Sequence, residues 1–373
     1  MVPALRIRRG RAQGVPPGAP PRDTRCHEGG HAPTGAVVAS APTPWRNPTL
    51  RTWTVSVWAL LTVFAPAAAQ MAASGPQQGA EGWYLPTRDQ AGELFVYEVG
   101  TGEPVVVLHG GPGADFTDLL PVARGLEKKF RFVFYDQRGS LRSPVVFDSI
   151  SMANHVDDLE TLREALGAQR IRILSHSAGT LLAFEYLRVH PDRVRELVLV
   201  GALPHKNGRR YFDDEYASFW RNLARDAKEF QDRDAIRSEL RGSGLEAPET
   251  AKQKSQAALI RQVGSETVHV ERWREALPTR VNPEAARRTR ETTNFEYDHS
   301  AILANHPFQV TVINGEFDYT VGPRGSPLWK RLRETLAPRL HGVIVPNASH
   351  IVWRDDPEVF RAELSAALAP EKR

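Results

Sequence analysis

The stretch IRILSHSAGTLLAF, residues 171–184, joins two apolar runs through Ser-His-Ser-Ala-Gly. The first run, residues 171–174, has the length and β-branched content of a buried strand, and the second has the pattern of a helix. A serine on a sharp turn from strand to helix exposes its hydroxyl if small residues stand two positions away on either side. Gly179 meets that need after Ser177, and Ser175 stands where glycine is more common. Ser177 is therefore the candidate nucleophile, and Ser175, still within the strand, is the weaker one.

The same alternation of short apolar runs and longer amphipathic stretches continues from about residue 92 onward. The expected strands cover residues 105–108, 131–139, 171–174, 196–202, 309–314 and 342–345. The expected helices cover residues 116–130, 151–169, 178–190, 328–336 and 357–368. Continuously apolar strands that alternate with helices indicate a parallel sheet with both faces covered.

The alternation stops between residues 205 and 307, where the segments are charged and mainly helical and no strand is evident. A helical insertion of this length between two strands predicts a cap. Ligands of such sheets lie beyond the carboxyl ends of the strands, so a cap there would cover the site. We therefore predict a core of residues 92–204 and 308–373, a cap of residues 205–307, and a linker of residues 70–91 before the core.

The first 69 residues differ in character from the rest. Residues 1–51 are rich in Pro, Gly and Arg and indicate a disordered or wrongly assigned leader, with translation beginning near Leu50 as one explanation. Residues 52–69 contain an uncharged apolar stretch that ends in Ala-Ala-Ala, the pattern of a signal peptide cleaved before Gln70. About 12 apolar residues fall short of the roughly 20 that span a bilayer. We expect export to the periplasm or the medium, without a stable membrane anchor.

Charge and cysteine content exclude several classes of function. The chain has 48 basic and 44 acidic residues, and eight arginines but only two acids lie in the first 69 residues. The remainder is nearly neutral, so its charge does not favour nucleic acid as a partner. The single cysteine, Cys26, belongs to the leader, so the expected mature chain has neither disulfides nor thiol chemistry. No metal or other cofactor is expected.

Two further candidates follow expected strands at the same edge of the sheet. Asp318 comes after the strand 309–314, and His350 comes after the strand 342–345. A serine hydroxyl is a weak nucleophile until an imidazole takes its proton, and a carboxylate orients that imidazole. The chain order Ser177, Asp318, His350 is the one expected for an α/β-hydrolase. The alternative is an Asx turn at Asp318 and a surface histidine at His350.

The stretch HGGPG, residues 109–113, follows another expected strand at this edge. Its glycines allow the backbone to approach a reacting group closely. The N–H groups of Gly111 and His176 are the expected donors to an oxyanion, and each such donor contributes about 3–4 kcal/mol to transition-state stabilisation. His109 is assigned to holding its own loop.

Five stretches together resemble the prolyl iminopeptidase branch of the α/β-hydrolases. They are HGGPG (109–113), YDQRGS (135–140), SHSAGT (175–180), GEFDYTVGP (315–323) and NASH (347–350). The resemblance implies the α/β-hydrolase fold, a mostly parallel sheet with helices on both faces and a helical cap insertion. It implies a serine peptidase that removes an N-terminal residue, often proline, from short peptides.

The resemblance also implies roles for individual residues. Gly110 and Gly111 correspond to the oxyanion loop, and residues 136–139 to a structural turn beside it. In that family cap carboxylates bind the ammonium group of the substrate, and Glu275 and Glu296 are the candidates here. A carboxylesterase or lactonase with the same triad is the alternative activity. A binding protein without catalysis on the same fold is a third interpretation.

Overall fold

The computed structural model describes residues 80–208, 214–318 and 326–369. The predicted leader, the predicted signal peptide and the first part of the linker lie outside these ranges. Within them, no helix combines the length and the apolar character that a membrane span requires.

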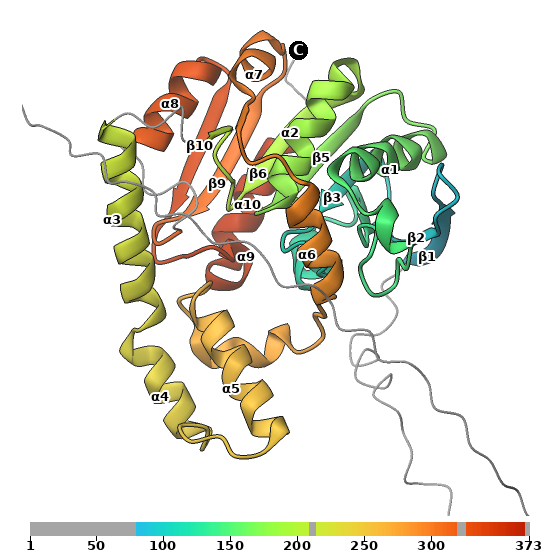
Figure 1. Ribbon diagram of the computed structural model, residues 1–373. Helices are drawn as coiled ribbons and strands as arrows, with labels where there is room; N and C mark the ends of the chain where they lie inside the picture. Colours follow the sequence, from blue (N-terminus) through green and yellow to red (C-terminus); the bar gives the residue numbers. More distant parts are fainter. Residues whose placement is uncertain (1–79, 209–213, 319–325, 370–373) are drawn as a thin grey trace, which may run out of the picture. The chain divides into compact units, whose positions relative to one another are not determined.

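An eight-stranded sheet forms the centre of the described chain (Figure 1). Its strands are β1 Glu81–Pro86, β2 Glu93–Gly100, β3 Pro104–Leu108, β4 Arg131–Tyr135, β5 Ile171–His176, β6 Val194–Val200, β9 Val310–Gly315 and β10 Leu340–Val345. Their spatial order is β1-β2-β4-β3-β5-β6-β9-β10. Strand β2 pairs antiparallel with both β1 and β4, and the other neighbours are parallel. The predicted mostly parallel sheet is confirmed.

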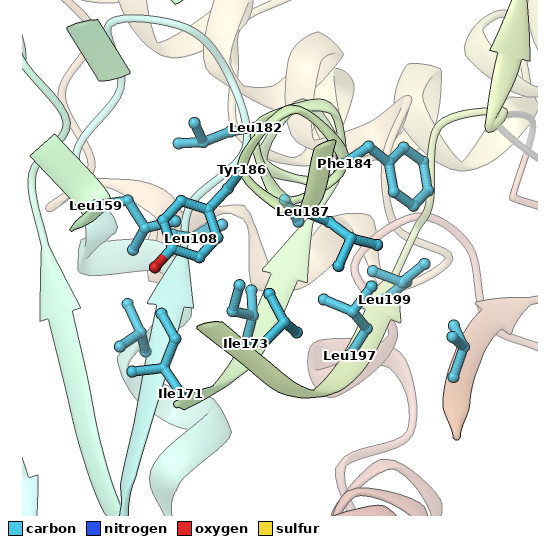
Figure 2. Close-up of a cluster of buried hydrophobic side chains, with 14 of the residues drawn as sticks. Leu108, Leu159, Ile171, Ile173, Leu182, Phe184, Tyr186, Leu187, Leu197 and Leu199 are labelled. Carbon is cyan, nitrogen blue, oxygen red and sulfur yellow. The ribbon is translucent and has the colours of Figure 1, made fainter. Parts of the chain in front are cut away.

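Both faces of the sheet are apolar, because successive side chains of a strand point to opposite faces. In β5, Ile171 and Ile173 join one buried cluster and Leu174 joins the cluster on the other face. Figure 2 shows the first cluster, in which Leu182 and Tyr186 of α2 pack over this face. The expectation of helices on both faces is therefore confirmed.

Side chains accept hydrogen bonds from free backbone N–H groups at the start of three helices of the core, α1 Met152–Ala165, α8 Pro327–Leu336 and α10 Pro357–Ala367. Ser151 caps α1 and Asp356 caps α10. The other helices of the core are α2 Gly179–Val189, α7 Ser300–Asn305 and α9 Val352–Asp355. Short 3-10 helices are η2 Phe116–Ala123, η3 Phe147–Ser149 and η4 Pro191–Arg193.

Between β6 and β9 lies the predominantly helical segment predicted from the sequence. Its elements before α7 are α3 Asp214–Gln231, α4 Asp234–Gly242, α5 Ala251–Gly264, η6 Val270–Ala276 and α6 Pro283–Thr292. Helix α7 falls within the predicted cap of residues 205–307, but its Leu303 packs in the main cluster of the core. Residues of α4, α5 and η6, among them Ile260 and Trp273, form an apolar cluster of their own. We call this segment the cap.

Several details differ from the sequence-based expectations. Strand β2 was not among the expected strands, and the strand expected over residues 131–139 ends at Tyr135. The helix expected over residues 116–130 is a 3-10 helix that ends at Ala123, since Pro121 removes a backbone N–H donor. Residues 81–86, assigned to the linker, form the edge strand β1. Within the cap segment, the short strands β7 Lys206–Asn207 and β8 Tyr297–Asp298 pair with each other, and two residues are too few to show a strand pattern.

Candidate active site

Ser177 stands on a strained turn between β5 and α2. Its φ of 51° lies in the left-handed region, which costs a residue with a side chain about 1–3 kcal/mol. The strand holds one side of the turn, because Ser177 N donates to Val200 O over 3.1 Å. Gly179 allows the close approach on the other side, since a Cβ there would lie 2.6 Å from Leu108 O. Ser175 is fully buried, whereas Ser177 is half-buried.

The HGGPG loop lies directly against this turn. A Cβ at Gly110 would lie 2.7 Å from the Cβ of Ser177, so no larger residue fits there. His109 is buried and its Nε2 accepts from Gln137 N over 3.1 Å, which leaves Nδ1 as the donor to Gly110 O at 3.0 Å. Gln137 Nε2 also donates to His109 O over 2.9 Å. The assignment of His109 to holding its loop agrees with these contacts, and the DQRG turn supports the same loop.

Asp318 and His350 meet as the strand order predicts. Nδ1 of His350 lies 3.2 Å from Oδ1 of Asp318, and both side chains are buried. The second carboxylate oxygen of Asp318 accepts from Asn314 Nδ2 over 3.3 Å. Because Nδ1 faces the carboxylate as donor, the other ring nitrogen, Nε2, is the one that can accept a proton.

Electrostatics favour a proton on His350. Burial alone would lower the pKa of the imidazole, but the Asp318 carboxylate outweighs burial, and Glu266 and Asp118 add to its effect. The pKa of His350 is therefore raised above its ordinary value of 6.5. This raised pKa strengthens the imidazole as a base in the range where it is unprotonated.

Ser177 and His350 both contact the end of β6. The backbone of Val200 binds Ser177 N, and the next residue, Gly201, packs against the imidazole of His350. A Cβ at Gly201 would lie 2.8 Å from Cε1 of His350. The structure thus brings three loops, separated by more than 170 residues at their extremes, to one edge of the sheet.

One expected donor needs correction. His176 is the last residue of β5 and precedes Ser177, whereas an oxyanion donor of this turn follows the nucleophile. The residue that follows is Ala178, the N-cap of α2. The side chain of His176 contacts the loop of the base instead. Its Nε2 lies 3.3 Å from His350 O, and its ring packs against Trp353. Ala178 can be read from the sequence by counting one position beyond Ser177.

The two cap carboxylates suggested by the resemblance occupy exposed positions. Both oxygens of Glu275 bind Arg272, at 2.7 and 3.0 Å. Glu296 lines a cavity of about 720 Å³ between α1, α2 and residues 292–299, and the lining contains none of the three triad candidates. The contacts of Glu275 and Glu296 therefore do not connect either residue with the triad candidates.

Glu266, in the turn after α5, is a cap carboxylate that sequence reasoning missed. Its backbone oxygen accepts from Ile351 N over 3.0 Å, so it lies beside the residue that follows His350. Burial raises the pKa of its half-buried side chain, Asp118 raises it further, and the charges of His350 and Arg354 act against this. Among the described residues its carboxylate has no hydrogen-bond or ion-pair partner. No local motif in SETVHV, residues 265–270, marks this glutamate.

Comparisons with known proteins show the family of the chain. Residues 103–357 match the family described as alpha/beta hydrolase fold. The proline iminopeptidase of Xylella fastidiosa (strain Temecula1) is 38% identical over 120 residues, which cover 30% of this chain and 37% of that protein. The proline iminopeptidase of Neisseria gonorrhoeae is 39% identical over 104 residues, covering 27% and 33%. The aligned part thus spans about a third of the length of these curated relatives.

Solved structures extend the likeness of the fold to most of the chain. A proline iminopeptidase-related protein from Thermus thermophilus has a TM-score of 0.54 and 24% identity, covering 78% of this chain and 98% of its own. A thermophilic esterase from Thermogutta terrifontis has a TM-score of 0.54 and 21% identity, covering 77% and 97%. At these identities the likeness concerns the fold alone. The chain belongs to the α/β-hydrolase family, and within it the chain resembles the proline iminopeptidases.

Proposed function

We propose that the protein is an exported serine aminopeptidase of the prolyl iminopeptidase type, which removes an N-terminal residue from short peptides. The observation that carries the proposal is the meeting of three loops at the strand edge. Ser177 stands there on a strained turn, and Asp318 holds Nδ1 of His350 at 3.2 Å. This arrangement supplies a nucleophile, a base and an orienting carboxylate.

The chemistry would proceed through an acyl-enzyme. Ser177 Oγ attacks the carbonyl carbon of the first peptide bond while Nε2 of His350 accepts the hydroxyl proton. His350 then gives this proton to the leaving amine, the carbon–nitrogen bond breaks, and the acyl group remains on Ser177. Water then attacks the ester carbonyl while His350 takes its proton. The bond between the carbonyl carbon and Ser177 Oγ breaks, His350 returns the proton to Oγ, and the free acid is released. Asp318 stabilises the imidazolium that forms in each half of the reaction.

The oxyanion would be bound by backbone N–H groups on both sides of the nucleophile. Gly111, with a φ of 65°, provides one candidate donor, and Ala178 replaces His176 as the other. Both belong to loops that the close contacts of Gly110 and Gly179 keep in place. Donors fixed before substrate binds need no rearrangement when negative charge develops, which is the main source of their effect.

Glu266 supports a substrate with a free amino group over a simple ester. A half-buried carboxylate without a partner among the described residues gains from a cation, because ion pairing offsets the cost of its burial. Its pKa is raised by that burial, which the charges of His350 and Arg354 offset only in part. We place Glu266 ahead of Glu275 and Glu296 as the residue that binds the substrate's ammonium group.

Export remains part of the proposal on the pattern of residues 52–69 alone. A chain expressed with its full N-terminus should be recovered from the periplasm or medium with Gln70 as its first residue. Mass spectrometry of the recovered chain tests this, and an uncleaved chain in the cytoplasm would contradict it.

The activity is tested with amino-acid naphthylamides and with simple esters. We expect hydrolysis of Pro- or Ala-naphthylamide, and no hydrolysis of their N-acetylated forms, because acetylation removes the cation that Glu266 would bind. Hydrolysis of p-nitrophenyl esters without any action on the naphthylamides would instead identify an esterase. Covalent labelling by a fluorophosphonate probe separates both enzymes from a binding protein without catalysis.

The role of Glu266 is tested by Glu266→Gln, which keeps the shape and removes the charge. We expect kcat/KM on the naphthylamides to fall about 10- to 100-fold, the range for losing one charged hydrogen bond or ion pair of about 1.5–3 kcal/mol. Cleavage of a neutral ester should change little. Glu275→Gln and Glu296→Gln are the matched controls, and an equal loss in either control would return the role to that residue.

A further inference from the structure

The residues on both sides of His350 are held by hydrogen bonds to partners outside their own loop. Ser349 N donates to Oδ2 of Asp355 over 2.8 Å, and Ile351 N donates to Glu266 O over 3.0 Å. The first partner lies at the end of α9 and the second lies in the cap. The backbone around the catalytic base is thus tied to two different elements.

Asp355 joins these two elements through its two carboxylate oxygens. While Oδ2 binds the loop of His350, Oδ1 accepts from Val268 N over 3.0 Å and from the Thr267 hydroxyl. Asp355 is only 9% exposed and Thr267 only 1%. Hydrogen bonds to a charged acceptor are stronger than those between neutral groups. One carboxylate therefore connects the cap turn of residues 265–269 with the loop of the base.

The opposite side of the same cap turn is held by Arg233. Its Nη2 donates to Gly264 O over 3.0 Å and to Thr267 O, and its Nη1 donates to Val268 O over 3.3 Å. Arg233 is the residue immediately before α4, so its position depends on where α3 and α4 lie. The cap turn lies between this guanidinium on the cap side and Asp355 on the core side.

We propose that Asp355 is a positioning residue, which makes the alignment of His350 with Ser177 and Asp318 depend on the seating of the cap. A displacement of about 1 Å at a reacting group can cost about 100-fold in rate. The cap would then do more than cover the site, because the base reaches its working position only when the cap turn is in place. The inference rests on the triad proposed above, and on no particular substrate.

The test uses Asp355→Asn in the full chain. The amide nitrogen must replace one carboxylate oxygen and cannot accept from the N–H group that it meets. We measure the second-order rate constant for labelling of Ser177 by a fluorophosphonate between pH 5 and 9, together with thermal unfolding. We expect the rate at pH 8 to fall at least tenfold. We also expect the midpoint of its pH dependence to move to lower pH, since the Asp318–His350 contact is weakened.

Asp356→Asn is the matched control. It removes the same charge one residue further on, and the Asp356 side chain caps α10 by accepting from Val359 N over 3.1 Å. Asp356→Asn should lower the unfolding temperature without changing the midpoint of the pH dependence of labelling. The carboxylates that raise the pKa of His350 are Asp318, Glu266 and Asp118, and the ring of His176 lies 4.6 Å from that of His350. All four residues stay unchanged in both variants.

A milder pair of variants keeps the test decisive if Asp355→Asn does not fold. Thr267→Val removes the hydroxyl donor and should slow labelling about threefold, whereas Thr267→Ser should label at the wild-type rate. A slower rate with an unchanged midpoint and a lower unfolding temperature would assign Asp355 a structural role only. Wild-type rate and midpoint in the variants would likewise overturn the inference. A wild-type protein that is never labelled would instead overturn the proposed triad.

Discussion

The two halves of the candidate site are built in different ways. On the nucleophile side, glycines allow backbone and side chain to touch directly, as Gly110 does at Ser177 and Gly179 does at Leu108. On the base side, Gly201 also packs against His350, but the loop of His350 depends in addition on hydrogen bonds to Asp355 and to the backbone of Glu266. Both halves touch the cap, the first through Asn282 N, which donates to Gly113 O over 2.7 Å, and the second through the turn of residues 265–269.

This difference separates the effects that mutations should have. A change on the nucleophile side should alter reactivity or stability without changing the pKa of the base, because its supports are steric contacts and backbone hydrogen bonds that do not involve Asp318 or the loop of His350. A change on the base side should alter the pH dependence, since it moves the imidazole relative to Asp318. A variant on the nucleophile side that shifts the pH profile would therefore contradict this distinction between the two halves.

The largest expected effect is that of Ser177→Ala. Losing the nucleophile of a triad costs about 10⁶-fold in kcat. Ser175→Ala should retain the wild-type labelling rate, because Ser175 lies within β5 and is buried. Steady-state kinetics and fluorophosphonate labelling check both variants. If a folded Ser175→Ala variant were not labelled, Ser175 would be the nucleophile in place of Ser177.

Asp318→Asn should be next, with a fall in kcat of about 10⁴-fold because the imidazole loses its orienting charge. Protonated His350 cannot act as a base, so kcat/KM of the wild type should fall as the pH drops through a pKa that lies above 6.5. Removal of the carboxylate takes away the main cause of that raised pKa. The midpoint of the acid limb should therefore move to lower pH in the variant. The pH profile of kcat/KM measures the shift, and an unchanged midpoint would contradict the assignment.

The features of the site that can be predicted from the sequence also differ between the nucleophile side and the base side. The turn at Ser177 was predictable because its causes are local, a buried strand before it and Gly179 after it. Asp318 and His350 were predictable because each follows an apolar run, and parallel strands end at a common edge. The donor after the nucleophile is also a local feature, because Ala178 directly follows Ser177, whereas His176 precedes it.

The base side could be predicted only in part. The place of Glu266 beside the His350 loop depends on Arg233 and Asp355, residues 33 positions before it and 89 after it. A charged side chain in a helical segment has no periodic signal that separates a buried role from a solvated one. The short η2 helix was missed for a related reason, since its apolar pattern fits an α-helix and only Pro121 argues against it.

On the nucleophile side, Asp158→Asn should lower the free energy of unfolding by about 3–5 kcal/mol, the cost of breaking a buried ion pair. Asp158 binds Arg138 of the DQRG turn at 2.6 and 2.7 Å, and both side chains are buried. Urea unfolding measures the loss. Asp157→Asn is the control, because its pair with Arg88 is exposed and should contribute less than about 1 kcal/mol. The acid limb of kcat/KM should keep its midpoint in Asp158→Asn, and a shift would erase the distinction between the two sides.

The smallest expected effect concerns the contact of α3 with the loop of Asp318. Phe230 stacks on Phe317, with ring centroids 6.0 Å apart, and the guanidinium of Arg233 lies 4.1 Å from the ring of Phe230. Such ring contacts contribute about 0.5–1.5 kcal/mol. Phe230→Ala should therefore lower kcat about threefold and move the acid limb slightly to lower pH.

The half-exposed Phe295, also in the cap, provides the control, and Phe295→Ala should change neither kcat nor the acid limb. Steady-state kinetics across pH measure both variants. If Phe230→Ala lowered only stability, the cap would act on the base through Asp355 alone. If it shifts the acid limb as expected, the cap touches both members of the Asp318–His350 pair. In that case the position of α3 and α4 sets the strength of the base as well as the shape of the site.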